Sequence, residues 1–500
     1  MSPIMQASLD RRRFLQGALA TVGLAAVGGT LTACSPSASS SGPSAAASGG
    51  STGTIDYWDW YVSQAPWVDN EIKLFSAASG ITVKKTTQVS DKYADLFGLA
   101  QRSESLPPVF MIPKAPAIQE QVAKGWLLPL DDFIDDKWKA RWPEGSFVEG
   151  VNTFGGKTYT AQFAGIAPSQ QIYIHNGVFK AAGLTNADGT VKLPKTWDDV
   201  TNAAAAIKSK AGGNVYPFGF GNNAGILGAW WLDMFARGAG SPGGCTNLDY
   251  RVGKYTYASD RNYADAMELF LEWKTKEYIH PNVQSMSDEQ ARALFAKGEF
   301  GMTIGGVWNQ PQWKTDGFTD YSMVTLPSTS GSPKAFFYGA PGSGFVGISA
   351  AAKDPEAAFK WFDWLYSVDA GKRWVEQEQG LSVFPENNDP SGIKFAPFAQ
   401  YVAMADMAKY GPAPTIRNPD VAKVSVDAVV PGVNDVATGI FTGQLGDVSA
   451  ALTDLQDRSQ AALEAGIKTA KGAGANVSID DYKFTDWDPT QTYITKPKSA

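Results

Sequence analysis

The chain has 500 residues and a formal net charge of −7, with 44% hydrophobic and 19% charged residues, which is ordinary for a globular protein. This length exceeds what one ordinary core supports and predicts two lobes. The negative charge argues against a nucleic-acid partner, which needs a basic face. The chain has only two histidines and two cysteines, so neither a bound metal nor another cofactor is expected.

Residues 1–33 have the order of a secretory signal peptide. Three arginines, Arg11 to Arg13, precede an apolar run from Ala18 to Val27 that is too short to span a bilayer comfortably. The pattern resembles a twin-arginine export signal. Leu31 to Cys34 resembles a bacterial lipobox, which predicts that Cys34 is lipidated; the alternative is a plain signal peptide with an incidental cysteine. Residues 34–53 then form a flexible linker that holds the globular part at the membrane, on its extracellular or periplasmic side.

The globular part opens with a strand, a helix and a second strand. Apolar residues alternate over residues 55–57, and helical spacing follows from Trp67 to Ala78, ending before Gly80. Residues 81–87 form the next predicted strand, and Val109 to Met111 form a buried one. This order predicts a parallel α/β layer.

Two helices further along the chain carry their own start signals. Thr196 and Asp199 have the spacing of a capping box. Asp354 is a suitable N-cap residue, and Pro355 after it is favoured in a first helical turn. Between these helices, Met302 to Ile304 form a short apolar strand. The alternation of strands and helices therefore continues along the chain.

Aromatic and short polar residues follow two of the predicted strands. Trp58, Asp59 and Trp60 come after the first strand, and Trp308 comes after the strand at Met302 to Ile304. In α/β sheets, ligands bind beyond the carboxyl ends of strands. An aromatic ring can stack on the apolar face of a sugar while polar side chains bind its hydroxyl groups. These residues predict a site for a neutral polyhydroxylated ligand; the alternative is packing within a lobe, and strand alternation predicts that at least one of the first three points inward.

Seven segments in order provide a family resemblance: DYWDW, GKTYTAQF, LPKTWDDV, ALFAKGEFGMTIGGVW, YGAPGSGFVGIS, KDPEAAFKWFDWLYS and QGLSVFPENND. Their order resembles the family 1 extracellular solute-binding proteins of ABC importers, which include maltose- and other sugar-binding proteins. The resemblance covers nearly all of the chain after the linker. It implies a two-lobed α/β fold of the periplasmic-binding-protein kind, with a hinge and a ligand cleft between the lobes.

The resemblance also implies lobe boundaries and further site residues. Lobe 1 comprises residues 54–163 plus 345–381, and lobe 2 comprises residues 164–344 plus 382–500. The chain crosses between them near Gln162 to Ala167, Pro341 to Gly347 and Gly380 to Pro385. Trp308 matches the cleft tryptophan of the family. The further candidates for ligand contact are Ser169, Asn223, Trp230, Trp231, Tyr338 and Ser343; where Ser169 stands, relatives carry a carboxylate.

The alternatives are a secreted lipoprotein glycoside hydrolase and a binding protein for another solute, such as a polyamine. A hydrolase of this kind needs two facing carboxylates, and the aromatic strand ends offer Asp59 alone. A polyamine site would also need several carboxylates. We therefore expect a monomeric binding protein without enzyme activity, which takes up a mono- or oligosaccharide and delivers it to an ABC permease.

Overall fold

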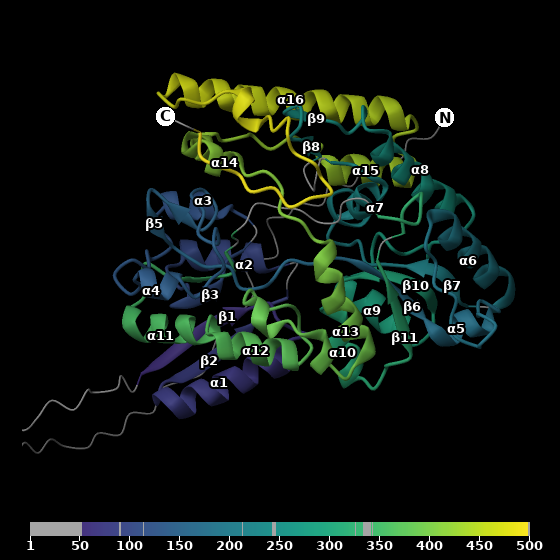
Figure 1. Cartoon of the computed structure of the whole chain (residues 1–500), viewed down its shortest axis with the longest axis horizontal. Coiled ribbons are helices and arrows are strands. Elements are labelled where there is room, and N and C mark those ends of the chain that lie inside the picture. Colours follow the sequence, from purple (N-terminus) through teal and green to yellow (C-terminus); the bar gives the residue numbers. More distant parts are fainter. Residues whose placement is uncertain are drawn as a thin grey trace, which may run out of the picture. The chain divides into compact units, whose positions relative to one another are not determined.

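The computed structural model describes residues 53–89, 92–113, 115–212, 214–242, 247–325, 327–333, 342 and 344–498. The predicted signal peptide, Cys34 and the linker up to residue 52 lie outside the described residues, as do the candidate residues Tyr338 and Ser343. Figure 1 shows the elements of the described body, which mixes helices with two four-stranded sheets.

The first sheet has the strand order β12-β3-β1-β2. Its strands are β1 (Thr54–Asp59), β2 (Thr82–Thr87), β3 (Val109–Met111) and β12 (Val346–Ile348). β1 runs parallel to β2 and β3, whereas β12 is antiparallel to β3. The helices of this part are α1 (Ala65–Ser79), α2 (Tyr93–Arg102), α3 (Ile118–Ala123), α4 (Asp136–Lys139), α11 (Pro355–Leu365) and α12 (Val368–Glu376). The predicted parallel layer is confirmed, and α1 ends at Gly80 as expected, with a left-handed φ of 74° at that glycine.

The second sheet has the order β11-β6-β10-β7. Its strands are β6 (Gln171–His175), β7 (Tyr216–Gly219), β10 (Phe300–Gly305) and β11 (Tyr321–Val324). Every residue of β10 is buried, because β10 is a central strand between β6 and β7. The helices of this part are α5 (Asn176–Ala181), α6 (Trp197–Lys210), the π-helix η1 (Leu227–Leu232), α7 (Asp233–Ala239), α8 (Arg261–Thr275), α9 (Asp288–Ala296), α10 (Asn309–Thr315) and α13 (Ala396–Ala403).

The C-terminal part is mostly helical. It contains α14 (Pro414–Arg417), α15 (Val433–Thr442) and α16 (Val448–Gly472), with 3₁₀ turns η3 (Pro385–Asn387), η4 (Pro390–Gly392), η5 (Met404–Met407), η6 (Pro419–Lys423) and η7 (Ile479–Tyr482). The short antiparallel pairs elsewhere are β4 (Thr153–Phe154) with β5 (Lys157–Thr158), and β8 (Leu248–Asp249) with β9 (Lys254–Tyr255). α15 packs on η1, and α16 packs on α8, α15 and β9. Figure 1 shows α16 and α15 in yellow-green tones beside α8.

Two of the three predicted crossing segments lie side by side. Ala164 forms an antiparallel bridge with Ser382, and the Gly165 N–H donates to the Leu381 carbonyl at 3.1 Å. In the remaining predicted crossing, Pro341 to Gly347, residues 341 and 343 lie outside the described residues, and Val346 and Gly347 belong to β12. The pairing brings together two segments more than 200 residues apart in the sequence, as expected of connections that share one hinge.

The predicted capping box of α6 is confirmed. Thr196 Oγ1 accepts from the Asp199 N–H at 3.0 Å, and Asp199 Oδ2 accepts from the Thr196 N–H at 3.0 Å. The predicted Asp354 cap of α11 is confirmed as well, because its side chain accepts from the Ala357 N–H at 2.9 Å. Local sequence signals therefore set the start of both helices.

We expect Thr196→Ala to lower the free energy of unfolding by about 1 kcal/mol, because the first turn of α6 loses its hydroxyl acceptor. The measurement is the denaturant midpoint and slope. The matched control is Thr453→Ala in α16, where the hydroxyl bonds only to the Ser449 carbonyl one turn back, so alanine is neutral or slightly stabilising there. Equal losses in the two variants would contradict the capping role.

Candidate functional site

At the end of β10, the Trp308 side chain folds back onto the backbone of Gly306. Gly305 ends the strand, and Trp308 precedes α10. A Cβ atom on Gly306 would overlap the Trp308 ring, and one on Gly305 would overlap the Asn309 amide. The two glycines thus allow the protein's own side chains to approach the backbone closely. The indole folds back over Gly306 and remains half-buried.

Trp308 is paired with a second half-buried tryptophan. The ring centroids of Trp308 and Trp230 are 6.1 Å apart at 68°, an edge-to-face arrangement. The Trp308 Nε1 donates to Asp288 Oδ2 at 3.1 Å. Trp231 lies beside Trp230, but it is only 1% exposed and its Nε1 donates to the Gly221 carbonyl at 2.9 Å. Trp231, which belongs to η1 like Trp230, therefore packs in the core, and the partly open aromatic surface consists of Trp230 and Trp308.

The π-helix η1 carries Trp230 and is held by α15. A Cβ atom on Gly228 would overlap the Val433 carbonyl, so the two segments are in close contact. The Ala229 N–H donates to Asn434 Oδ1 at 2.8 Å. π-Helical turns are rare and occur frequently at functional sites. The C-terminal helix α15 therefore helps to position Trp230.

At the end of β1, alternation separates the three candidate residues. Trp58 and Trp60 are half-buried, whereas Asp59 is 0% exposed. Trp60 makes edge-to-face contacts with Tyr93 at 4.9 Å and with Phe345 at 5.6 Å between ring centroids. One of the three residues points inward as expected from alternation, and it is the carboxylate rather than an indole.

Asp59 is a charged group in an apolar environment. Neither carboxylate oxygen has a hydrogen-bond partner of normal geometry among the described residues, and the neighbouring Thr87 hydroxyl has none either. Burial raises the pKa of Asp59 to about 6, against smaller opposing effects of the Thr87 hydroxyl and the Lys85 ammonium. The carboxylate is closed to solvent in this structure.

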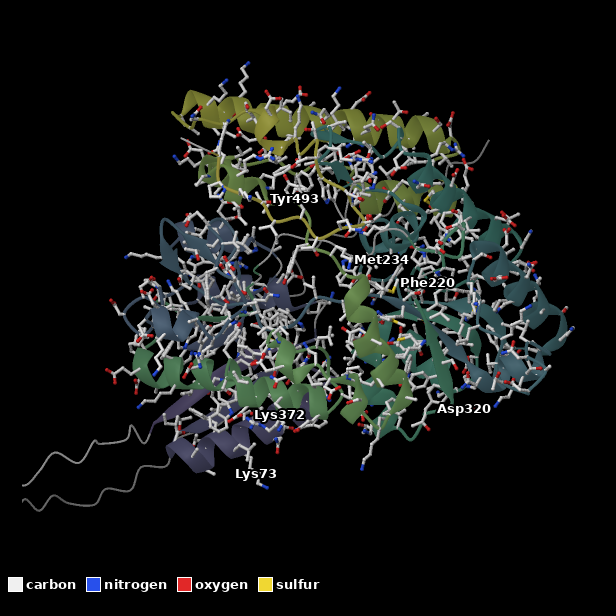
Figure 2. The ribbon with its side chains drawn as sticks, viewed as in Figure 1. Lys73, Phe220, Met234, Asp320, Lys372 and Tyr493 are labelled. Carbon is white, nitrogen blue, oxygen red and sulfur yellow. The ribbon has the colours of Figure 1, made fainter. Side chains whose placement is uncertain are left out.

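The polar candidates lie in the second-sheet part. Ser169 is half-buried; its Oγ donates to Gln170 Oε1 and lies 3.8 Å from the Met234 sulfur. Figure 2 labels Met234 close to Phe220, which belongs to the same core. Asn223 is exposed, and its backbone N–H donates to the Met286 carbonyl at 3.0 Å. Its amide is therefore open to a ligand.

Three residues that contact this region were missed by sequence reasoning: Ser63, Asp288 and Arg292. Asp288 and Arg292 are four residues apart on α9 and form an ion pair at 2.7 Å. Their spacing is the available sequence signal, because residues i and i+4 lie on one helix face. That this pair touches Trp308 depends on tertiary structure and has no local signature.

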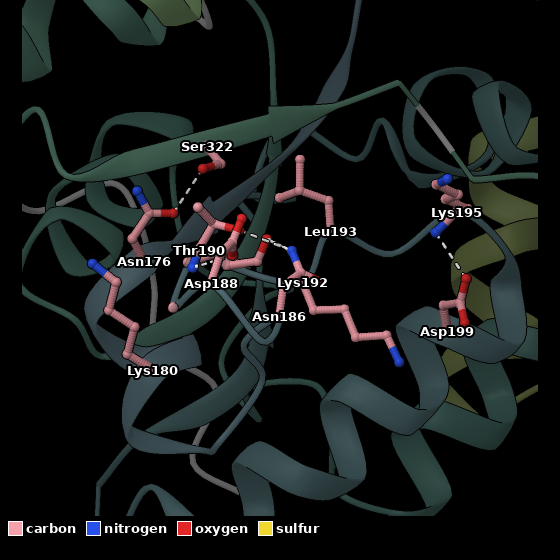
Figure 3. A pocket seen from close by; sticks show the side chains of 12 residues that line it. Asn176, Lys180, Asn186, Asp188, Thr190, Lys192, Leu193, Lys195, Asp199 and Ser322 are labelled. Atoms are coloured by element: carbon pink, nitrogen blue, oxygen red, sulfur yellow. Dashed lines mark hydrogen bonds between the residues drawn. The ribbon is translucent and has the colours of Figure 1, made fainter.

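Two surface cavities can be described, and none of the predicted site residues lines either. The larger, of about 940 Å³, lies beside the segment from Asn186 to Lys195 and is shown in Figure 3. Its two carboxylates are already engaged: Asp188 accepts from Thr190, and Asp199 accepts from the Lys195 and Thr196 N–H groups. The smaller, of about 510 Å³, lies near His280. Both belong to the second-sheet part and are open to solvent.

Within the described ranges, no cluster of three histidine, cysteine or acidic side chains suits a metal ion. Over the same ranges, no helix combines the length and the apolar character needed to cross a bilayer.

Two sheets with alternating helices, and aromatic residues at the ends of strands, are the features that the resemblance implies for a solute-binding protein. A family model described as bacterial extracellular solute-binding protein matches residues 38–372. The match covers more than half of the chain, and the chain belongs to this family. The resemblance noted in the sequence is thus confirmed.

One curated relative and two solved structures illustrate the similarity. An uncharacterized ABC transporter extracellular-binding protein of Pyrococcus horikoshii is 23% identical over 355 residues, covering 70% of this chain and 73% of that protein. A structure described for xylan utilization by Caldanaerobius polysaccharolyticus has a TM-score of 0.63 at 19% identity, covering 81% of this chain and 99% of the other. The GacH receptor of Streptomyces glaucescens, solved unliganded and with acarbose, has a TM-score of 0.61 at 16% identity, covering 82% and 98%.

The fold is therefore the two-lobed α/β fold of periplasmic binding proteins, as predicted. The chain is a bacterial extracellular solute-binding protein, a binding protein rather than an enzyme, because it belongs to that family. The hydrolase alternative is thereby set aside.

Proposed function

We propose that this protein binds a mono- or oligosaccharide in the cleft between its lobes and delivers it to the permease of an ABC importer. The observation that carries the proposal is the pair of half-buried indoles, Trp230 and Trp308, beyond the carboxyl end of β10. Trp58, near the carboxyl end of β1, and Trp60, just after it, hold the corresponding place on the first sheet. Two structurally similar proteins also support a carbohydrate ligand: one was described in a study of xylan utilization, and the other was solved in complex with acarbose.

In this proposal the indoles stack on apolar sugar faces, and Asn223 and Ser169 bind hydroxyl groups. Tyr338 and Ser343 remain candidates for the same role. Ligand binding closes the lobes about the paired segments at Ala164 and Ser382, and the permease recognises the closed form. We retain the lobe boundaries predicted above, namely 54–163 plus 345–381 and 164–344 plus 382–500.

We further propose that the protein acts as a monomer that is anchored through Cys34 and faces the extracytoplasmic side. Residues 34–53 then serve as the tether between the lipid and lobe 1. Acyl-chain analysis of the membrane-associated protein by mass spectrometry tests the anchor, and Cys34→Ser should release the protein from the membrane.

The function is tested by thermal denaturation of the purified protein against a carbohydrate panel, with polyamines as a parallel panel. A ligand that binds only the folded state stabilises it by about 2.7 kcal/mol at a concentration of 100 times Kd. We expect one or a few sugars to raise Tm in a concentration-dependent manner. A rise in Tm with polyamines and none with sugars would replace the carbohydrate proposal with the other solute class.

A further inference from the structure

The Arg292 guanidinium joins a segment that follows β1 of the first sheet to two helices of the second-sheet part. Arg292 lies on α9 and is only 6% exposed. Its Nη1 donates to Ser63 Oγ at 2.7 Å, and its Nε donates to Asn309 Oδ1 at 2.8 Å. Its Nη2 pairs with Asp288 Oδ2 at 2.7 Å. Ser63 follows β1, whereas the other partners lie on α9 and α10, so one buried cation connects the end of the first sheet to that of the second.

The same contacts lead to the candidate site. The Asp288 oxygen that pairs with Arg292 also accepts the hydrogen bond from the Trp308 Nε1. Asn309, the next residue after Trp308, is 2% exposed and accepts from Nε of the same guanidinium. Because a guanidinium presents its donors in one rigid plane, a shift of Ser63 relative to α9 changes the geometry of all these bonds.

We propose that Arg292 is a positioning residue that couples the orientation of the Trp308 indole to the relative position of the two lobes. This inference rests on the proposed function, in which Trp308 stacks on the sugar. With Ser63 bonded, the guanidinium, the Asp288 carboxylate and the indole are held in one arrangement before the ligand arrives. Preorganisation of this kind raises affinity, because binding then requires less ordering of the site.

Ser63→Ala tests the coupling, because it removes the contact from the first sheet and leaves the Arg292–Asp288 pair in place. The protein is labelled with 5-fluorotryptophan, and the ¹⁹F NMR resonance of Trp308 is assigned through Trp308→Phe. We expect this resonance to shift or broaden in the ligand-free variant. We also expect Kd for the sugar found in the panel to rise roughly three- to tenfold, the range for one net hydrogen bond.

Lys314→Ala is the matched control. The Lys314–Glu378 ion pair, at 2.8 Å, also joins α10 to the segment after α12, but it has no bond to Trp308. The control should leave the Trp308 resonance and Kd unchanged. A wild-type Trp308 resonance in Ser63→Ala, or an equal change in Lys314→Ala, overturns the inference. The Trp308 resonance is recorded without ligand, so it tests the positioning role even if the protein binds no sugar. A failure to bind any sugar would contradict only the proposed function.

Discussion

Trp308→Ala is expected to weaken carbohydrate binding by more than about tenfold, which corresponds to about 1.4 kcal/mol or more. The indole is half-buried, so part of its face is open to a ligand, and alanine offers no surface on which a sugar can stack. The fold should persist, because the lost contacts are those with Trp230 and Asp288 at the edge of the second-sheet core. Titration calorimetry gives Kd, and circular dichroism during heating gives Tm.

Two further variants separate stacking from other effects. Trp308→Phe keeps a flat ring but loses the bond to Asp288, so its affinity should lie between those of the wild type and Trp308→Ala. Trp138→Ala removes a half-buried indole of α4 that donates to Asp363 at 2.7 Å, outside the candidate site, and should leave Kd unchanged. Wild-type affinity in Trp308→Ala, or loss of the folded state, would remove Trp308 from the site.

The elements that the sequence predicted well are those with local signals. Strand β3 has the predicted bounds, Val109 to Met111, because a short apolar run flanked by prolines leaves few alternatives. The start of α6 follows from the reciprocal bonds of Thr196 and Asp199. Periodicity and capping act over a few residues, so both can be read without knowledge of the fold.

The candidate site was predicted less completely, because its geometry depends on contacts between distant segments. Trp230 and Trp231 are adjacent in sequence, yet one is half-buried and the other packs in the core. Which of them meets Trp308 depends on how α15 holds the π-helix. The bond between Ser63 and Arg292 joins residues 229 positions apart, and no local pattern predicts such a contact. The burial of Asp59 depends likewise on which face of β1 meets the core.

Asp59→Asn is expected to stabilise the protein at neutral pH, by up to about 3 kcal/mol. The buried carboxylate has a pKa raised to about 6, whereas an unfolded chain has an ordinary aspartate pKa of about 3.9. Between these values the folded state binds more protons than the unfolded state, so the free energy of unfolding falls as pH rises from about 4 to 6. Above pH 6 the folded protein carries the full cost of a buried anion, at about 1.4 kcal/mol for each pH unit between the two pKa values.

Asparagine has nearly the shape of protonated aspartate and cannot ionise, so its advantage should grow along the same pH range. We expect denaturant midpoints of Asp59→Asn and wild type to coincide near pH 3.5 and to separate fully by pH 7. The matched control is Asp56→Asn, at an exposed position of the same strand, which should show no such pH-dependent gain. A gain that is equally large at pH 3.5 would mean that the gain does not come from removing a buried anion. A loss of stability at pH 7 would mean that the Asp59 anion is stabilised by its surroundings. In that case the favourable effects of the Thr87 hydroxyl and the Lys85 ammonium on the Asp59 anion would outweigh the cost of its burial.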